Sequence, residues 1–175
     1  MRKIVFYGAI SLDGFLSDQN DNLQWLFDTD LNNTSTYEKF EQNVDTFIMG
    51  RTTYEETKQM LNGQELYPGK EKIVFSHHLQ TKDANTEFVD GDITRVVKSH
   101  QNKAGKAIWI VGGGTILKPL LEKNLIDEYW IQIAPVLLGT GKRLFEEGNY
   151  RFRLEFIETT QMGELTELHF KKKNN

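Results

Sequence analysis

The chain has 175 residues, no cysteine and a formal net charge of -4, with charges of both signs interspersed. This length fits one domain spanning residues 1–175 with a single core. The lack of cysteine excludes disulfides, a thiol nucleophile and thiolate metal ligands. The mixed charge argues against binding to nucleic acid, which requires clustered Lys and Arg.

The N-terminal residues superficially resemble a secretion signal, because Arg2 and Lys3 precede an apolar run at residues 4–10. The run stops at Ser11 without a small-residue cleavage pattern, and no later stretch reaches membrane-spanning length. We therefore expect a cytoplasmic protein that does not contact a membrane.

Strands and helices alternate along most of the chain. Runs of β-branched and apolar residues predict buried strands at residues 4–10, 46–49, 72–75, 107–111 and 129–134. Helical patterns lie between them at residues 36–43, 52–61, 92–102 and 115–124, with Pro119 inside the last one. This alternation predicts an α/β fold with a mostly parallel, helix-covered sheet. Alternating apolar residues at 152–156 and 168–170 predict a C-terminal antiparallel hairpin.

The segment after the first predicted strand is acidic. Residues 8–9 are small and leave room for a flat ring, whereas Asp13 belongs to an Asp-Gly dipeptide that is typical of a turn. Trp25 fits core or lid packing better than a stacking platform. Asp28 and Asp30 could supply a proton or bind an amino group of a heterocycle, or they could simply be solvated.

The second strand-to-helix junction contains Gly50, Arg51, Thr52 and Thr53. Glycine permits close approach of a ligand, arginine can pair with a phosphate, and a threonine hydroxyl can cap the helix. A plain N-cap beside a surface arginine would give the same pattern.

The third junction carries Ser76, His77 and His78, whose polar groups could contact a 2′-phosphate or could be solvated. Three such junctions in one parallel sheet favour a single extended anionic ligand. The spacing of His and Glu suggests no metal site, and no Ser-His-Asp arrangement indicates acyl transfer.

The sharpest local signal is the glycine triplet Gly112, Gly113 and Gly114, which leads from an apolar strand through Thr115 into a helix. Exposed amides and the dipole at such a helix N-terminus form a site for phosphate or pyrophosphate. The pattern is neither the spaced dinucleotide fingerprint nor a Walker P-loop. The alternative is a tight turn that binds nothing.

Taken in order, these motifs resemble the dihydrofolate reductase-like superfamily, and more closely the stand-alone relatives of the reductase domain of riboflavin biosynthesis. The motifs are AISLDG at 9–14, MGRTTYE at 49–55, FS at 75–76, VGGGT at 111–115 and LIDEY at 125–129. Residues 135–141 and 144–145 fit the same family, so the resemblance covers essentially the whole chain.

The resemblance implies a three-layer fold with an eight-stranded, mostly parallel sheet and helices on both faces. It also implies a homodimer, and NADPH lying across the strand ends to reduce a substrate ring. Carried over by position, the implied cofactor-binding residues fall into four groups. They are Ala9 and Leu16 at the nicotinamide, Gly50, Arg51, Thr52 and Thr53 at phosphates, Ser76 at the adenosine ribose or its phosphate, and Gly112, Gly113, Gly114 and Thr115 at the pyrophosphate. His77 is added as a cofactor-binding residue from its place after Ser76.

On the substrate side, dihydrofolate reductases place a buried acid a few residues after a tryptophan. Spacing from Trp25 assigns this acid to Asp30, whereas counting back from Met49 reaches Thr34. Ile131 stands where a polar pterin-binding residue is expected, which does not favour folate as the substrate.

The sequence therefore predicts an NADPH-dependent oxidoreductase acting on a pterin-like, pyrimidine-like or other small electron-poor substrate. Asp30, or water held by Asp13, is the expected proton donor, with Trp25 as a further site residue. The alternatives are an NADPH-binding module without catalysis and a sheet that no longer binds the cofactor. The preference for NADP over NAD rests on Arg51, Ser76 and the two histidines that follow it.

Overall fold

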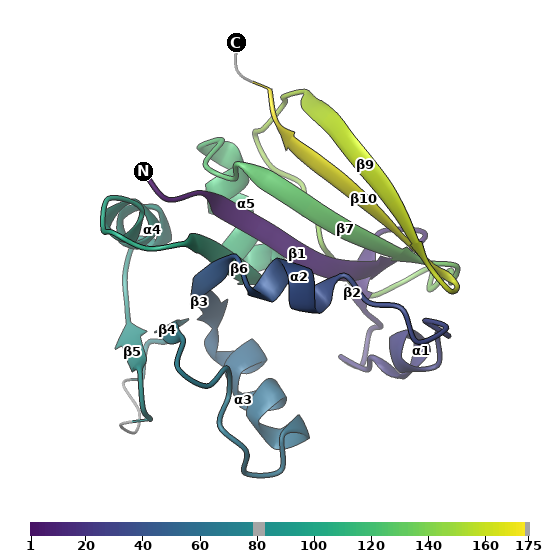
Figure 1. Cartoon of the computed structure of the whole chain (residues 1–175), viewed down its shortest axis with the longest axis horizontal. Coiled ribbons are helices and arrows are strands. Elements are labelled where there is room, and N and C mark those ends of the chain that lie inside the picture. The colour runs from purple at the N-terminus through teal and green to yellow at the C-terminus, as the bar shows by residue number, and fades with distance from the viewer. Residues whose placement is uncertain (79–82, 174–175) are drawn as a thin grey trace.

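The computed structural model describes residues 1–78 and 83–173 (Figure 1). Its main sheet has the strand order β5-β4-β3-β6-β1-β7-β10-β9, and β2 pairs with β8 in a separate ribbon. The strands are β1 (Ile4–Ser11), β2 (Phe15–Ser17), β3 (Val44–Gly50), β4 (Glu71–Phe75), β5 (Thr86–Val89), β6 (Ala107–Gly112), β7 (Glu128–Ala134), β8 (Lys142–Arg143), β9 (Leu154–Met162) and β10 (Leu165–Lys172).

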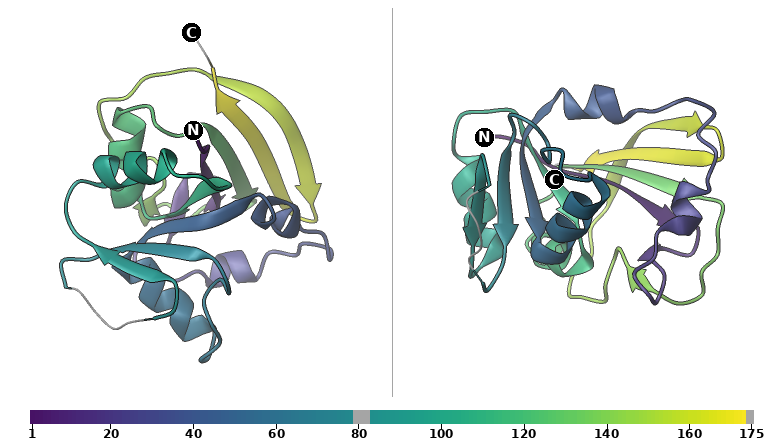
Figure 2. Two further views of the ribbon diagram at one scale, coloured as in Figure 1. Left: turned by 60° about the vertical axis from the view of Figure 1, so that its left-hand side comes forward. Right: turned by 90° about the horizontal axis from the view of Figure 1, so that it is seen from below.

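The six strands from β5 to β7 are all parallel to their neighbours, whereas β10 is antiparallel to both β7 and β9. The predicted mostly parallel sheet with a C-terminal hairpin is therefore confirmed. Figure 2 shows this hairpin at the opposite side of the sheet from β5 and α4. The carboxyl ends of the six parallel strands consequently lie along one edge of the sheet.

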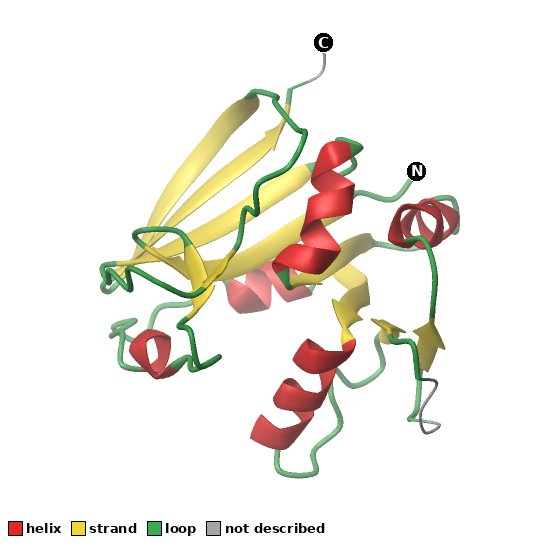
Figure 3. Cartoon of the chain, turned by 180° about the vertical axis from the view of Figure 1, so that it is seen from behind, coloured by secondary structure: helices red, strands yellow, loops and turns green. Residues whose placement is uncertain are grey.

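Helices cover both faces of the sheet, as the three-layer prediction requires. They are α1 (Gln24–Phe27), α2 (Tyr37–Glu41), α3 (Arg51–Met60), α4 (Ile93–Gln101) and α5 (Gly114–Glu122). α4 and α5 pack on one face, and α2 and α3 pack on the other. In Figure 1 α2 lies in front of the sheet, and Figure 3 shows the opposite side with α5 in front.

The alternation of side chains along β1 explains the two cores. Ile4 and Phe6 point to the face covered by α4 and α5, whereas Val5 and Tyr7 point to the aromatic core beneath α2. All four side chains are buried, so this strand has a continuous apolar run and not an alternating one. Its central position in the sheet follows from that pattern.

Four elements were not predicted from the sequence, namely the short helix α1, the edge strand β5 and the ribbon strands β2 and β8. β5 has only four residues, and one of its side chains, Glu87, is exposed. β8 has two residues, both exposed. Segments this short carry no readable hydrophobic period. Helix α5 continues through Pro119, which removes one backbone donor without ending the helix.

Candidate functional site

A long open cleft with a volume of about 1160 Å³ runs along the carboxyl ends of β1, β3, β4 and β6. All twelve residues assigned to cofactor binding from the sequence line it: Ala9, Leu16, Gly50, Arg51, Thr52, Thr53, Ser76, His77, Gly112, Gly113, Gly114 and Thr115. Ligands of parallel α/β sheets bind at this edge. Junctions far apart in sequence thus share one cavity.

Two helices begin at the cleft without a side-chain cap. α3 follows Gly50 and α5 follows Gly113, and no side chain accepts a hydrogen bond at either N-cap. α4 differs, because the carboxylate of Asp92 accepts the backbone N–H of Thr94. The first-turn N–H groups and the dipoles of α3 and α5 are therefore directed at the cleft, where an anion would be stabilised.

Each glycine of the triplet is required for a separate reason. Gly112 and Gly113 have φ angles of 143° and 88°, which residues with a Cβ rarely adopt. Gly114 has no room for a side chain, because a Cβ there would lie 2.6 Å from Glu146 Oε1 and 2.9 Å from the carbonyl oxygen of Arg143. The backbone at the start of α5 therefore stays bare toward the cleft.

Basic side chains line the same cavity. Arg51 is half exposed and lies 3.9 Å from the carboxylate of Glu55 one turn further along α3. Such an exposed pair contributes little, so the guanidinium is available to a ligand phosphate. Arg143 of β8 also lines the cleft and stacks 4.6 Å above the ring of Phe15. This stacking fixes a second guanidinium on the wall opposite α3.

The β4 end of the cleft is more acidic than the sequence suggested. The Ser76 hydroxyl donates to the carbonyl of His78 at 2.7 Å and accepts its N–H, so its proton is already used locally. His77 is exposed and its Nδ1 lies 2.9 Å from the carboxylate of Asp90, which also lines the cleft. A carboxylate here suits a ribose hydroxyl better than a 2′-phosphate.

The β1 end of the cleft is apolar. Ala9 and Leu16 are partly exposed to it, and Gly8 leaves its backbone uncovered. A Cβ at Gly8 would lie 2.8 Å from Cζ of Phe6, so this aromatic ring packs directly against the glycine. The resulting surface is flat and has few side-chain donors, which suits a planar ring.

Asp13, one of the three predicted catalytic residues, lies outside the cleft and binds the loop after β7. Its carboxylate accepts the Ser11 hydroxyl at 2.6 Å and the backbone N–H groups of Leu138 and Gly139 at 3.1 and 2.7 Å. The Ser11 hydrogen bond, together with these backbone donors, lowers the pKa of Asp13 to about 2. This ionised carboxylate therefore joins the turn after β1 to the loop after β7.

Asp30 and Trp25 also lie outside the cleft. Asp30 is exposed, its backbone contacts Glu164 in both directions, and its carboxylate accepts the N–H of Asn32 at 2.8 Å. Trp25 packs beside the small core of Ala134, Met162 and Leu165. The spacing from Trp25 assigned the buried acid to Asp30. In the structure, the segment after α1 runs along the β9–β10 turn and does not line the cleft.

Several residues of the cleft were missed by sequence reasoning, and they come from the end of α3, from the loop after β5 and from the segment around β8. They are Glu56, Thr57, Met60, Asp90, Gly91, Lys142, Arg143, Glu146 and Glu147. The basic pair after Gly141 was the only local signal. The antiparallel pairing of β8 with β2 brings this segment over the cleft, and a two-residue strand cannot be predicted from periodicity.

The strand order and the cleft at the sheet's carboxyl edge are those of the dihydrofolate reductase-like fold. The structure is similar over 98% of the chain, with a TM-score of 0.69 and 14% identity, to 97% of a dihydrofolate reductase from Enterococcus faecalis complexed with NADP(H). At that identity the similarity establishes the fold alone.

The family model of the RibD C-terminal domain matches residues 2–168, and the chain belongs to this family. It is 32% identical to the uncharacterized protein YwjB of Bacillus subtilis over 170 residues, which cover 97% of each chain. A putative riboflavin biosynthesis protein from Shewanella sp. PV-4 is 26% identical, with a TM-score of 0.79 and coverage of 99% of this chain and 100% of the other. The predicted resemblance is thereby confirmed.

In the part of the chain that the structure describes, none of the helices combines the length and apolar character needed to cross a bilayer.

Proposed function

We propose that this protein is a cytoplasmic, NADPH-dependent oxidoreductase that reduces a small pterin-like, pyrimidine-like or other electron-poor ring. One observation carries the proposal: two uncapped helix starts, at Gly50 and Gly113, open into one cleft that spans four neighbouring strands. Separate anion sites on a shared edge suit a ligand with phosphates at two positions. A reductase-type fold in the family supports the same conclusion.

The residues present fit the pyrophosphate and nicotinamide parts of such a cofactor, whereas Asp90 makes the adenosine end acidic. The bare backbone of residues 112–114 would hold the pyrophosphate, and Arg51 with Thr52 would hold phosphate oxygens at α3. The apolar surface at Ala9 and Leu16 would take the nicotinamide, which supplies a hydride. The protein's contribution is to orient that ring and to exclude water from it on the β1 side.

Proton delivery must come from a group near the β1 end of the cleft. The predicted donors Asp13 and Asp30 lie outside the cavity, whereas Asp21 and Glu146 line it. The carboxylate of Asp21 is paired with the ammonium of Lys142 at 2.5 Å. Glu146 lies beside the start of α5. Because the start of α5 is where the pyrophosphate would lie, we propose solvent or Asp21 as the proton source.

An NADPH-binding module without catalysis is a second candidate. It is favoured by one observation, namely that all three predicted catalytic residues, Asp13, Trp25 and Asp30, fall outside the cleft. Both candidates require the cofactor to bind, and they differ only in whether it is consumed.

Calorimetric titration of the protein with NADPH and with NADH tests the shared requirement. We expect saturable NADPH binding that weakens roughly tenfold or more in Arg51→Ala, because hydrogen bonds to charged groups contribute about 1.5–3 kcal/mol. Arg95→Ala is the matched control, since Arg95 is exposed on α4 and does not line the cleft. The absence of saturation by either nucleotide at millimolar concentration would refute both candidates.

A second experiment distinguishes a reductase from an NADPH-binding module without catalysis. Protein and NADPH are mixed with a panel of pterins, pyrimidines and quinones, and the nicotinamide absorbance is followed. Oxidation that depends on one ring class supports the reductase and identifies its substrate type. Saturable binding with no oxidation across the panel supports the module.

A further inference from the structure

A buried histidine lies at the amino end of the parallel strands, away from the cleft. His100 is in the last turn of α4, and only 6% of its side chain is exposed. Its Nδ1 lies 3.0 Å from the carbonyl oxygen of Val96. Its Nε2 is buried and has no hydrogen-bond partner among the residues that the structure describes.

The Val96 contact determines which nitrogen is free. A carbonyl oxygen only accepts, so Nδ1 carries the proton and the neutral ring leaves a lone pair on Nε2. A buried lone pair without a donor is unfavourable, because burial of an unsatisfied polar atom costs about 1–3 kcal/mol. The ring is oriented as in metal sites, where the second nitrogen donates to a carbonyl.

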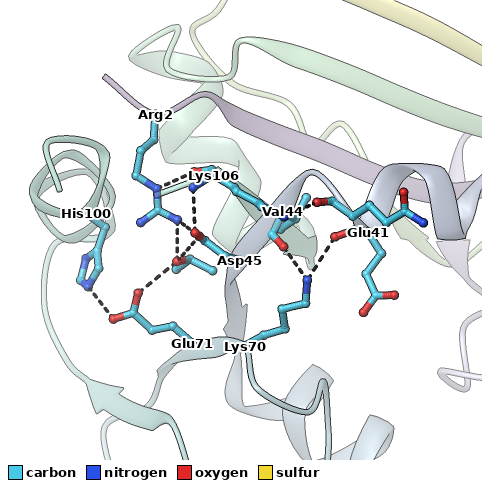
Figure 4. Close-up of polar contacts among 10 residues, drawn as sticks. Arg2, Glu41, Val44, Asp45, Lys70, Glu71, His100 and Lys106 are labelled. Atoms are coloured by element: carbon cyan, nitrogen blue, oxygen red, sulfur yellow. Dashed lines mark hydrogen bonds and ion pairs between the residues drawn. The ribbon is translucent and has the colours of Figure 1, made fainter. Parts of the chain in front are cut away.

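Two carboxylates face this lone pair. One oxygen each of Glu71 and Glu87 and a ring nitrogen of His100 all lie within 4.8 Å of one another. Glu71 Oε1 is 3.8 Å from Nε2, which is too long for a hydrogen bond (Figure 4). Its other oxygen, Oε2, is 3.0 Å from the Thr46 hydroxyl, which can donate to it and so orient the carboxylate.

The cationic side chain of Arg2, which lines the same pocket as the two glutamates, is already engaged. The guanidinium of Arg2 is buried, pairs with Asp45, and donates from Nε to the carbonyl of Lys106 at 2.6 Å (Figure 4). It also contacts Thr46, and it forms no ion pair with Glu71 or Glu87 among the described residues. With Arg2 compensated by Asp45, the two glutamates carry an excess of negative charge beside the C-terminal, negative end of α4.

We propose that Glu71, Glu87 and His100 bind a divalent cation of the zinc type. Imidazole nitrogen with two carboxylate oxygens suits Zn²⁺ better than Mg²⁺ or Ca²⁺, which prefer oxygen alone. Ligand bonds of about 2.0–2.2 Å place tetrahedral ligands about 3.5 Å apart, so the cluster closes by about 1 Å. Glu87 is exposed and can move by that amount, and water completes the coordination.

The site would join three elements at the edge of the sheet. Glu71 is the first residue of β4, Glu87 lies in β5 and His100 lies in α4. The four-residue strand β5 pairs with β4 alone, so a cation would hold it against the helix. The cofactor cleft lies at the other ends of these strands, so the cation would not contact the cofactor. Ligands drawn from three elements have no spacing motif, which is why the sequence suggested no metal.

Binding is measured by competition between the chelator-treated protein and a chromophoric chelator for Zn²⁺, with melting temperature as a second readout. We expect one equivalent to bind and to raise the melting temperature. Glu87→Gln and His100→Gln should each weaken binding at least tenfold. Glu158→Gln is the matched control, because Glu158 is also an exposed glutamate beside a buried histidine, His169.

Two results would overturn the site: no binding below millimolar Zn²⁺, or binding that is unchanged in Glu87→Gln. Because Glu87 is exposed, that variant stays informative even where His100→Gln fails to fold. Visible absorption of bound Co²⁺, present in the wild type and absent in Glu87→Gln, gives an independent check. None of these readouts requires NADPH, so the cation site and the proposed reductase activity are tested separately.

Discussion

Asp13 accepts a hydrogen bond from the backbone N–H of Gly139 at 2.7 Å, and this bond fixes the loop after β7 to the turn after β1. We expect Asp13→Asn to lower the melting temperature at neutral pH, because the amide offers a weaker acceptor than the carboxylate. Nucleotide affinity should change little. Asp28→Asn, which alters an exposed carboxylate with one side-chain partner, is the control.

The same bond gives a pH dependence. The pKa of Asp13 is lowered to about 2 from 3.8 in the folded protein, chiefly by the Ser11 hydroxyl. A depressed folded-state pKa contributes stability that is complete above the unfolded value and is lost as pH falls toward the folded value. The difference in melting temperature between wild type and Asp13→Asn should therefore shrink between about pH 5 and about pH 2. A constant difference would contradict this role.

Gly113 and Gly63 form a matched pair for testing the cleft. Both have a φ of 88°, and at neither position would an added Cβ lie closer than 4.0 Å to a neighbouring heavy atom. Valine at either position should lower stability, because residues with a Cβ rarely adopt this φ. Only Gly113→Val should weaken NADPH binding, by about tenfold or more, since Gly63 does not line the cleft. Equal nucleotide affinity in the two variants would remove the α5 start from the binding site.

Asp90 tests the preference for NADPH over NADH. Its carboxylate lies at the β4–β5 end of the cleft, paired with His77, where it would repel a 2′-phosphate. Replacement of Asp90 by Ser should therefore raise the affinity for NADPH relative to NADH, as measured by parallel titrations. A ratio that does not change would show that the adenosine end of the cofactor lies elsewhere.

Substitution of Asp30 tests whether this residue delivers the proton to the substrate. Because Asp30 is exposed beside the β9–β10 turn, we expect Asp30→Asn to leave turnover on a confirmed substrate unchanged. Asp21→Asn, in the cleft wall, should lower turnover more than NADPH affinity. A large loss of turnover in Asp30→Asn alone would instead require that its loop reach the cleft during catalysis.

The family resemblance predicts a homodimer, and edge strand β9 offers a surface for it. Phe156 on this strand is 58% exposed. We expect sedimentation to give twice the mass of the 20.3 kDa chain and Phe156→Glu to shift it toward the monomer. Phe27→Glu is the control, because Phe27 is 60% exposed and belongs to α1, not to the edge strand. A monomeric wild type would contradict the expectation.

Much of the fold could be predicted because the strands that make the core are continuous apolar runs. The run at Ile4 to Ile10 and the one at Ala107 to Val111 fall in β1 and β6, the central pair of the sheet. Helix boundaries at α3, α4 and α5 were predicted to within two residues. The short strands β5, β2 and β8 could not be predicted, since their pairing depends on tertiary contacts.

The cofactor side of the cleft was predictable and its opposite wall was not. Glycine at positions 112–114 signals a local backbone requirement, and that requirement is visible in the sequence itself. The position of Asp30 depends instead on the path of a long loop, and its contact with Glu164 joins residues 134 positions apart. The grouping of Glu71, Glu87 and His100 depends on the same kind of long-range arrangement.

The N-termini of α3, α4 and α5 differ in whether a side chain caps the helix, and this difference limits the length of the ligand. At α4 the Asp92 carboxylate takes the place that an external anion would need, while α3 and α5 have no such internal substitute. A molecule bound along this edge can therefore anchor phosphates at two helices but not at the third. Replacing Asp92 by glycine would leave a third helix N-terminus free to bind a phosphate. Longer polyanions would then compete with the cofactor for this edge of the sheet.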